Sequence, residues 1–159
     1  MRKRILSLFC VLALCLGLLP ATALAAGSWT YYPKSDVEDR LYGYIKQGDL
    51  QVGVRSEAEE GTGEKSPYNL IIGSNGDEFG DATALDLTGT ITDSSGTPCV
   101  IIEDSGTTGR YQITSVLLPD TVKRISANAY SNAALTSINF PASLESIEHS
   151  AFYGSALKE

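Results

Sequence analysis

The sequence predicts a mainly β fold, in which a leucine-rich-repeat solenoid of 22-residue coils follows an irregular all-β N-terminal capping region. Three observations lead to this expectation. An apolar pattern recurs at a fixed period from position 113, short apolar stretches between turn residues occupy the preceding region, and the chain opens with an export signal. The expected organisation is a signal peptide at 1–25, a capping region at 26–112 and repeats at 113–159.

Residues 1–25 have the order of features that marks a secretory signal peptide. A positive segment, Arg2–Arg4, precedes an apolar run from Ile5 to Leu19, and Ala23 and Ala25 give the spacing of a cleavage site. This apolar run is shorter than the ~20 residues that a membrane-spanning helix needs. We therefore expect cleavage after Ala25 and a secreted or cell-surface protein with no membrane span after cleavage.

Composition narrows the class of partner. The chain has 12 basic and 19 acidic residues, for a net charge of −7, and signal cleavage leaves nine basic residues against 19 acidic ones. Because such an acidic chain is repelled by phosphate backbones, we expect no nucleic-acid partner. Cys99 would be the one cysteine of the mature chain and lies in an apolar run, which indicates a small buried side chain.

The capping region contains several strand candidates, separated by Gly, Asp, Ser and Asn turn residues. Leu41–Val54 is expected to form a strand pair around the turn at 47–49, and further strands are expected at Asn69–Ile72, Ala84–Ile91 and Cys99–Glu103. We expect this region to dock on the first coil of the repeats and to cap it.

Aromatic residues gather within a short stretch of the capping region. Such rings can stack on sugars, so carbohydrate binding by this region is one functional hypothesis. Trp and Tyr in a strand pair more often pack against neighbouring side chains, and we favour packing. The residues are Trp29, Tyr31, Tyr32, Tyr42 and Tyr44.

A shift of one 22-residue period aligns the segment 113–137 with the segment 135–159. Apolar positions fall on apolar positions, and each copy has the spacing apolar-x-x-apolar-x-apolar that is typical of a leucine-rich-repeat strand. Val116 and Leu118 are two positions apart, as are Ile138 and Phe140, so each pair should point into the core. The proline that follows ends the strand. Each coil is expected to contain a short strand, a turn, a second extended piece and a return turn.

The sequence stops soon after a third copy begins. Leu157–Glu159 matches the opening of the repeat, and no polar capping coil follows. We therefore expect two full copies and the start of a third, in the N-terminal part of a longer array. Alternatively, a partner copy covers the last coil.

Each copy of the repeat contains two specific features, a strand followed by proline and an alanine followed by an aromatic residue. In the second copy these are Leu135–Pro141 and Ala151–Gly154, and in the first they are Thr114–Val116 with Pro119, and Ala129–Tyr130. This pattern resembles the BspA-type leucine-rich repeats of bacterial surface proteins. It departs from them where Ser126 or Glu148 replaces a glycine, and a frequent cysteine is missing. The resemblance implies the repeat fold and an extracellular interaction role, such as adhesion to host proteins or to other cells.

The sequence offers no arrangement of catalytic residues. The single histidine, His149, aligns with Ala127 of the other copy, which is typical of a surface position. Cys99 lacks an obvious base, and neither a phosphate-binding glycine loop nor metal-ligand spacing occurs. The acidic stretch Asn75–Asp81 resembles a calcium loop, but Phe79 takes the place of an oxygen donor. We expect no enzymatic activity, no cofactor and no metal.

Binding is the remaining function. Side chains that alternate with the core set should face outward from the repeat strands, and they are the candidate contacts: Ser115, Leu117, Ser137 and Asn139. The expected partner is an extracellular protein on a host or bacterial surface, with a glycan as a second possibility. Two alternatives stay open, namely a non-catalytic targeting region of a larger cell-wall or polysaccharide-active enzyme, and carbohydrate binding by the aromatic N-terminal region.

Overall fold

The computed structural model describes residues 27–33, 43–56, 68–73, 77–106 and 110–158. The expected signal peptide at 1–25 lies outside these ranges, as does Tyr42 of the aromatic group. Within them, regular structure is β except for one 3-10 turn, η3 at Arg110–Gln112. Among the same residues, no helix has the length and apolar character needed to cross a membrane.

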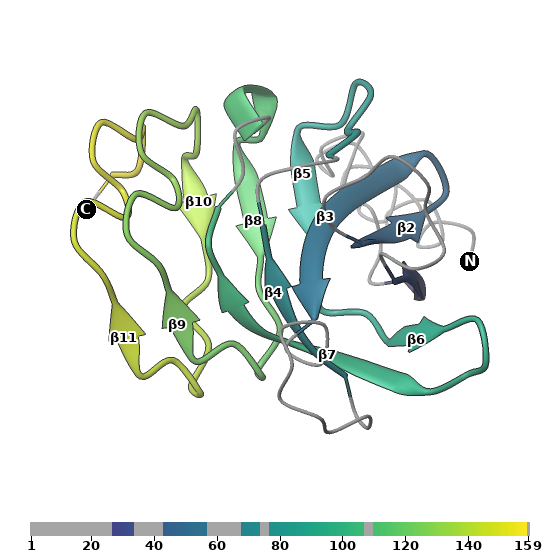
Figure 1. The fold of residues 1–159 in the computed structure, drawn as a ribbon. Helices are drawn as coiled ribbons and strands as arrows, with labels where there is room; N and C mark the ends of the chain where they lie inside the picture. The colour runs from purple at the N-terminus through teal and green to yellow at the C-terminus, as the bar shows by residue number, and fades with distance from the viewer. Residues whose placement is uncertain (1–26, 34–42, 57–67, 74–76, 107–109, 159) are drawn as a thin grey trace, which may run out of the picture.

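Six strands close into a barrel in the N-terminal part of the chain (Figure 1). They follow the order β7-β4-β3-β2-β1-β6, and β6 pairs with both β1 and β7, which closes the ring. Closure leaves no free edge among these six strands. The strands are β1 (Trp29–Tyr32), β2 (Gly43–Gln47), β3 (Leu50–Ser56), β4 (Tyr68–Ile72), β6 (Ile91–Asp93) and β7 (Pro98–Asp104).

The closed barrel shows that the predicted fold class is wrong. The chain is mainly β, but its large sheet closes into a six-stranded barrel and does not form a solenoid of leucine-rich-repeat coils behind an irregular cap. The sequence does not predict the barrel because closure depends on the pairing of Trp29 with Ile91. Two residues so distant in the sequence leave no periodic pattern that reports their contact.

The individual strands of this region follow the sequence expectations more closely. The predicted pair in Leu41–Val54 is the β2–β3 hairpin, whose turn contains Gly48 at a φ of 58°, where glycine is favoured. The strands expected at Asn69–Ile72 and Cys99–Glu103 are β4 and β7. The expected strand Ala84–Ile91 is two strands.

An aspartate separates these two strands. β5 (Ala84–Asp86) ends where Asp86 Oδ1 accepts hydrogen bonds from the Thr88 amide at 2.9 Å and from its hydroxyl at 2.6 Å. This local turn competes with continued strand pairing. The chain then crosses to the barrel, where Ile91 begins β6.

The C-terminal residues continue two sheets away from the barrel (Figure 1). β9 (Arg124–Ile125) and β11 (Ser146–Ile147) extend the sheet from β7, whereas β8 (Ser115–Leu117) and β10 (Ser137–Ile138) extend from β5. All of these pairs are parallel, and the register of β10 on β8 and of β11 on β9 equals one 22-residue period. The sequence period is therefore the pairing register of two coils, the first at 113–134 and the second at 135–156.

Left-handed residues recur in the return turns of the coils. Asn128 has a φ of 60° and Ser150, its equivalent in the second coil, has a φ of 56°. Asn132 and Gly154 form a second equivalent pair, at 57° and 69°. Asparagine and glycine tolerate this conformation better than other residues, so serine is the exception among the four.

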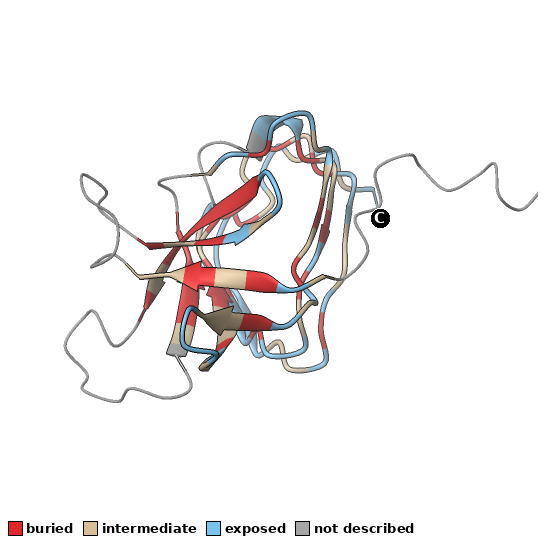
Figure 2. Cartoon of the chain, turned by 90° about the vertical axis from the view of Figure 1, so that its right-hand side faces the viewer, coloured by how far each residue is buried: buried red, intermediate tan, exposed pale blue. Residues whose placement is uncertain are grey.

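One hydrophobic core joins the barrel to the coils. It includes Trp29 in β1, Val52 in β3 and Ile101 in β7, and it continues to Ile125 and Ala151 in the coils. In Figure 2, buried residues (red) alternate with less buried ones along strands such as β1 and β7, as expected for strands with one face in the core, whereas β3 is buried almost throughout. The coils are therefore packed directly on the barrel.

Candidate functional site

Three of the four predicted contact residues lie on the strands β8 and β10. Val116 between them is buried, whereas Leu117 is 43 % exposed, Ser137 is exposed and Ser115 is half-buried. Together these three side chains form a small outer surface. Leu117 provides its apolar part.

Asn139, the fourth predicted residue, lies just after β10 and is half-buried. Its side-chain oxygen accepts a hydrogen bond from the Leu118 amide at 2.6 Å, and its side-chain nitrogen donates to the Leu118 carbonyl at 2.8 Å. The amide side chain thus takes the place of a strand backbone and continues the β8–β10 pairing. These bonds give Asn139 a structural role at the sheet end.

The second coil exposes apolar side chains whose equivalents in the first coil are buried. Phe140 is 57 % exposed where Leu118 is 1 % exposed, and Ile147 is 48 % exposed where Ile125 is fully buried. The expectation that Phe140 is a core residue fails for this reason. We use the name end face for these two residues and the partly buried apolar residues beside them: Ile138, Phe140, Leu144, Ile147, Phe152 and Leu157.

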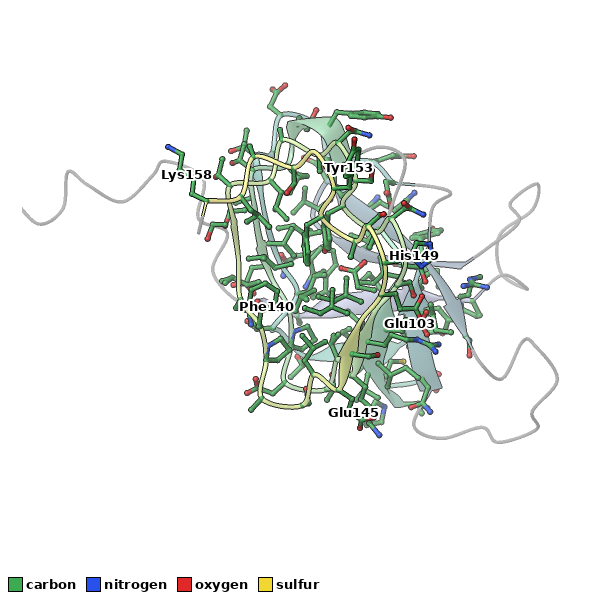
Figure 3. All side chains as sticks on the ribbon, turned by 90° about the vertical axis from the view of Figure 1, so that its left-hand side faces the viewer. Glu103, Phe140, Glu145, His149, Tyr153 and Lys158 are labelled. Atoms are coloured by element: carbon green, nitrogen blue, oxygen red, sulfur yellow. The ribbon has the colours of Figure 1, made fainter. Side chains whose placement is uncertain are left out.

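Stacked rings connect the end face to the core. Phe152 stacks on Tyr130 of the first coil, with ring centroids 5.5 Å apart, and Phe140 meets the edge of Phe152 at 6.0 Å. Figure 3 looks onto this face, with Phe140 on the β10 side of the coil and His149 on the β11 side. Glu145, Tyr153 and Lys158 lie around its edge in the same view. The arrangement is an apolar centre with a mainly polar rim, as in protein interfaces.

Two strand edges border the end face. β10 is the last strand of the three-stranded sheet and β11 is the last strand of the larger sheet. Within the described residues, neither has a strand on its outer side. Such edges present backbone amides and carbonyls that can pair with another chain.

A row of polar side chains fastens the coils to the barrel. Glu103 of β7 accepts hydrogen bonds from the Arg124 guanidinium and from the hydroxyl of Ser126, and from the Ser105 hydroxyl at 3.2 Å. Burial alone would raise the pKa of Glu103, but the hydrogen bonds and the positive charge of Arg124 together lower it. Glu148 of the second coil also contacts the first coil. One of its carboxylate oxygens lies 3.9 Å from Arg124 Nε, and the other accepts a hydrogen bond from the Ala127 amide at 3.1 Å.

A cleft of about 700 Å³ opens where the barrel meets the first coil. Its walls are the segment 87–92, the start of β7 and the turn at 118–121, and Asn139 lies at its edge. Cys99, on its wall, is buried as expected. Burial raises the pKa of the Cys99 thiol to about 11, with a further contribution from the negative charge of Asp93.

The structure also places His149 and part of the calcium-like stretch Asn75–Asp81. His149 is exposed. In the calcium-like stretch, Phe79 packs in the core, and the Asp77 carboxylate accepts a hydrogen bond from the Gly53 amide at 2.8 Å. Residues 74–76 of the calcium-like stretch lie outside the described ranges. Among the residues that the structure describes, no three His, Cys, Asp or Glu side chains group closely enough to hold a metal ion.

The aromatic residues are packed, as the sequence favours. Trp29 and Tyr31 are buried in the barrel, and Tyr32 stacks on Tyr44 with ring centroids 4.9 Å apart. Tyr32 and Tyr44 are the two rings of this group that are half-buried in the described part of the chain. Packing therefore explains these four aromatic residues.

Comparison with known proteins identifies the C-terminal segment. Residues 101–159 match the family model of the BspA type leucine-rich repeat region, and neither a curated protein nor a solved structure matches the chain. The match begins in β7, which pairs with β9 in the first coil. From Ile101 onward the chain is therefore similar to the BspA type leucine-rich repeat region.

Proposed function

We propose that the protein is a secreted or cell-surface module that binds an extracellular partner protein through its end face. The exposure of Phe140 and Ile147 carries this proposal, because the same positions are buried in the first coil. Large exposed apolar patches rimmed by polar residues mark interaction sites. An aromatic side chain at the centre of such a patch is a typical binding hot spot.

The two strand edges support the same surface. A partner that presents an extended segment can pair with the outer edge of β10 or β11 while its apolar side chains cover Phe140 and Ile147. Backbone hydrogen bonds would supply affinity and the apolar contacts would supply specificity. The outer surface formed by Ser115, Leu117 and Ser137 is a smaller, secondary contact region, since Leu117 is its one large exposed apolar side chain.

An extracellular location is part of the proposal. It is supported by the sequence of residues 1–25, which has the features of an export signal, and by the occurrence of the matched repeat in surface and secreted proteins. Adhesion to host or bacterial surface proteins is the corresponding biological role. A targeting region of a larger enzyme would use the same binding surface.

A pair of matched variants tests the end face. Residues 26–159, the mature chain expected after signal cleavage, and their Phe140→Ser and Tyr111→Ser variants are titrated against a panel of purified extracellular matrix and bacterial surface proteins by biolayer interferometry. Tyr111 is also exposed but lies in η3, away from the end face. We expect Phe140→Ser to weaken binding at least tenfold, as for an aromatic hot spot, and Tyr111→Ser to leave it unchanged. Equal binding by both variants would contradict the assignment of the site, and no binding by the parent would contradict the function.

A further inference from the structure

The cleft between the barrel and the first coil has a lining suited to one kind of ligand. Its accessible apolar part consists of proline and valine side chains that are exposed or half-buried. Its polar part consists mainly of threonine hydroxyls and one carboxylate. The accessible apolar lining includes Pro98, Val100 and Pro119, and the polar lining includes Thr88, Thr90, Thr92, Asp120 and Thr121, whereas Leu87, Ile101 and Leu118 of the lining are at most 1 % exposed.

The walls of the cleft are fixed in place by hydrogen bonds and by close backbone packing. The Trp29 amide donates to the Thr90 carbonyl at 2.8 Å, and the Thr121 hydroxyl donates to the Ile101 carbonyl at 2.7 Å. Gly89 packs so closely that a Cβ there would lie 1.7 Å from the Gly27 carbonyl oxygen. A cavity held on both sides in this way is largely pre-formed, as small-ligand and side-chain pockets usually are.

Charge distinguishes the possible occupants. Asp120 is exposed and is the one charged residue of the lining, which contains no lysine or arginine. The side chains of Thr90, Thr92 and Asp120 make no hydrogen bond to any described residue, so their oxygens can accept from a ligand. The chain as a whole carries a net charge of −7, which adds to the attraction for a cation. An anionic ligand would meet repulsion and no compensating donor of positive charge.

We propose that this cleft binds a short segment of a partner protein that carries a lysine or arginine next to an apolar residue. The methylene stem of a basic side chain packs on apolar surface while its cation stays near water, which fits the accessible Val100 and Pro119 beside the exposed Asp120. A volume of about 700 Å³ is within the range of peptide and small-ligand sites and holds more than one side chain. The lining of the cleft and the end face have no residue in common. The inference therefore rests on the proposed function only in taking the bound segment from an extracellular partner protein.

Two peptides of opposite charge test the cleft directly. Acetyl-Leu-Lys-Leu-amide and acetyl-Leu-Glu-Leu-amide are titrated into the ¹⁵N-labelled mature chain, and amide shifts are followed by NMR. We expect saturable shifts at Thr88–Thr92 and at Thr121 with the lysine peptide, and none with the glutamate peptide. Trp29 fluorescence gives a second signal, because the Trp29 amide is bonded to a wall residue.

Variants separate this site from the end face. Asp120→Asn should raise the Kd for the lysine peptide about two- to fivefold, the effect of losing an exposed ion pair, and added salt should reduce the difference. Asp49→Asn, in the exposed β2–β3 turn, is the matched control, and Phe140→Ser should leave peptide binding unchanged. Absence of saturable shifts, equal binding of the two peptides, or identical Kd values for Asp120→Asn and Asp49→Asn would overturn the proposal. Loss of partner binding in Phe140→Ser would test the proposed function of the end face and would not test peptide binding by the cleft.

Discussion

Asn139 binds both backbone polar groups of Leu118, accepting from its amide at 2.6 Å and donating to its carbonyl at 2.8 Å. The first coil is thereby fastened to the second beyond the last paired residue of β10. Asn139→Ala removes both bonds, and we expect a loss of about 1–2 kcal/mol in the free energy of unfolding. Urea denaturation of the mature chain measures it.

Asn139→Asp refines the same test. The carboxylate can still accept from the Leu118 amide but cannot donate to the carbonyl, and it places a negative charge beside that oxygen. We expect Asn139→Asp to be at least as destabilising as the alanine variant at pH 7. Ser137→Ala, on the exposed outer surface, is the control and should stay within about 0.5 kcal/mol of the parent. Equal stability of all three variants would show that the Leu118 bonds do not hold the coils together.

Glu103 makes stability depend on pH. Burial alone raises its pKa, but the bonds from Arg124 and Ser126 outweigh burial, so the pKa in the folded chain lies below the ordinary value of 4.5. A lowered pKa means that its contribution is fully present above about pH 4.5 and is lost as the pH falls through the folded value. We expect the Tm of the parent to fall more steeply below pH 4.5 than the Tm of Glu103→Gln.

The control for this prediction is an exposed glutamate. Glu145 lies 4.0 Å from Lys123 and both side chains are largely exposed, so Glu145→Gln should follow the parent profile. Ser126→Ala removes one donor to Glu103 and should move the acid transition to higher pH. A Glu103→Gln profile parallel to the parent would refute the role of this carboxylate.

Cys99 should react slowly with thiol reagents. Its pKa is raised to about 11, and because the thiolate is the reactive form, only about a thousandth of the thiol is ionised at pH 8. We expect the labelling rate of the folded mature chain by a disulfide reagent to rise with pH up to about 11. The urea-unfolded chain, with an ordinary thiol, provides the comparison and should react at least a hundredfold faster at pH 8. Similar rates in both states would show that the thiol is neither buried nor perturbed.

Ser150 has a backbone conformation that its side chain disfavours. Its φ is 56°, whereas Asn128 has a φ of 60° at the equivalent position of the first coil. Ser150→Gly should therefore stabilise the chain by up to about 1 kcal/mol, and Ser150→Asn by less. Ala142→Gly is the control, because Ala142 is exposed and does not share the positive φ. It should destabilise by about 0.5–1 kcal/mol, and the same sign for Ser150→Gly would contradict the prediction.

The sequence predicts local features of this fold better than its closure. The β2–β3 hairpin and the 22-residue register follow from glycine at a turn and from apolar spacing, and both involve residues whose relation is visible in a linear pattern. The pairing of Trp29 with Ile91 involves no such pattern, so the sequence does not reveal the barrel. Alternation predicts Asn139 as an outward contact, but it does not reveal that its amide pairs with Leu118.

The candidate site shows the same limit. Alternation predicts that Phe140 points into the core of the second coil, but Phe140 is 57 % exposed and contacts only the partly buried Phe152 among the described aromatic rings. Exposure depends on what lies beyond the coil, and a repeat pattern assigns the same environment to every copy. The cleft is not visible in the sequence either, because its lining comes from four separate segments of the chain. The polar residue Asp120 within an apolar stretch is its one local sign.

The end face should cause the chain to associate with other copies of itself. Phe140 and Ile147 are exposed, and the outer edges of β10 and β11 are open within the described residues. Both features favour contact between chains, so we expect the mature chain to self-associate at high concentration. Analytical ultracentrifugation should detect the association, and Phe140→Ser combined with Ile147→Ser should weaken it. The double variant Tyr111→Ser with Leu117→Ser removes exposed apolar side chains elsewhere and should not.

Covering the end face should have the opposite effect. Fusing one additional 22-residue copy and a polar cap after Glu159 should place a parallel neighbour on β10 and β11, which are the last strands of their sheets, and should bury the exposed Phe140 and Ile147. Because contacts between neighbouring coils dominate the stability of stacked repeats, the fused chain should have a higher Tm and slower hydrogen exchange at residues 135–156. It should also remain monomeric where the parent associates. If the parent is already monomeric, and its second coil is as protected as in the fused chain, then the exposed side chains are stable in water. The end face would then need no covering chain.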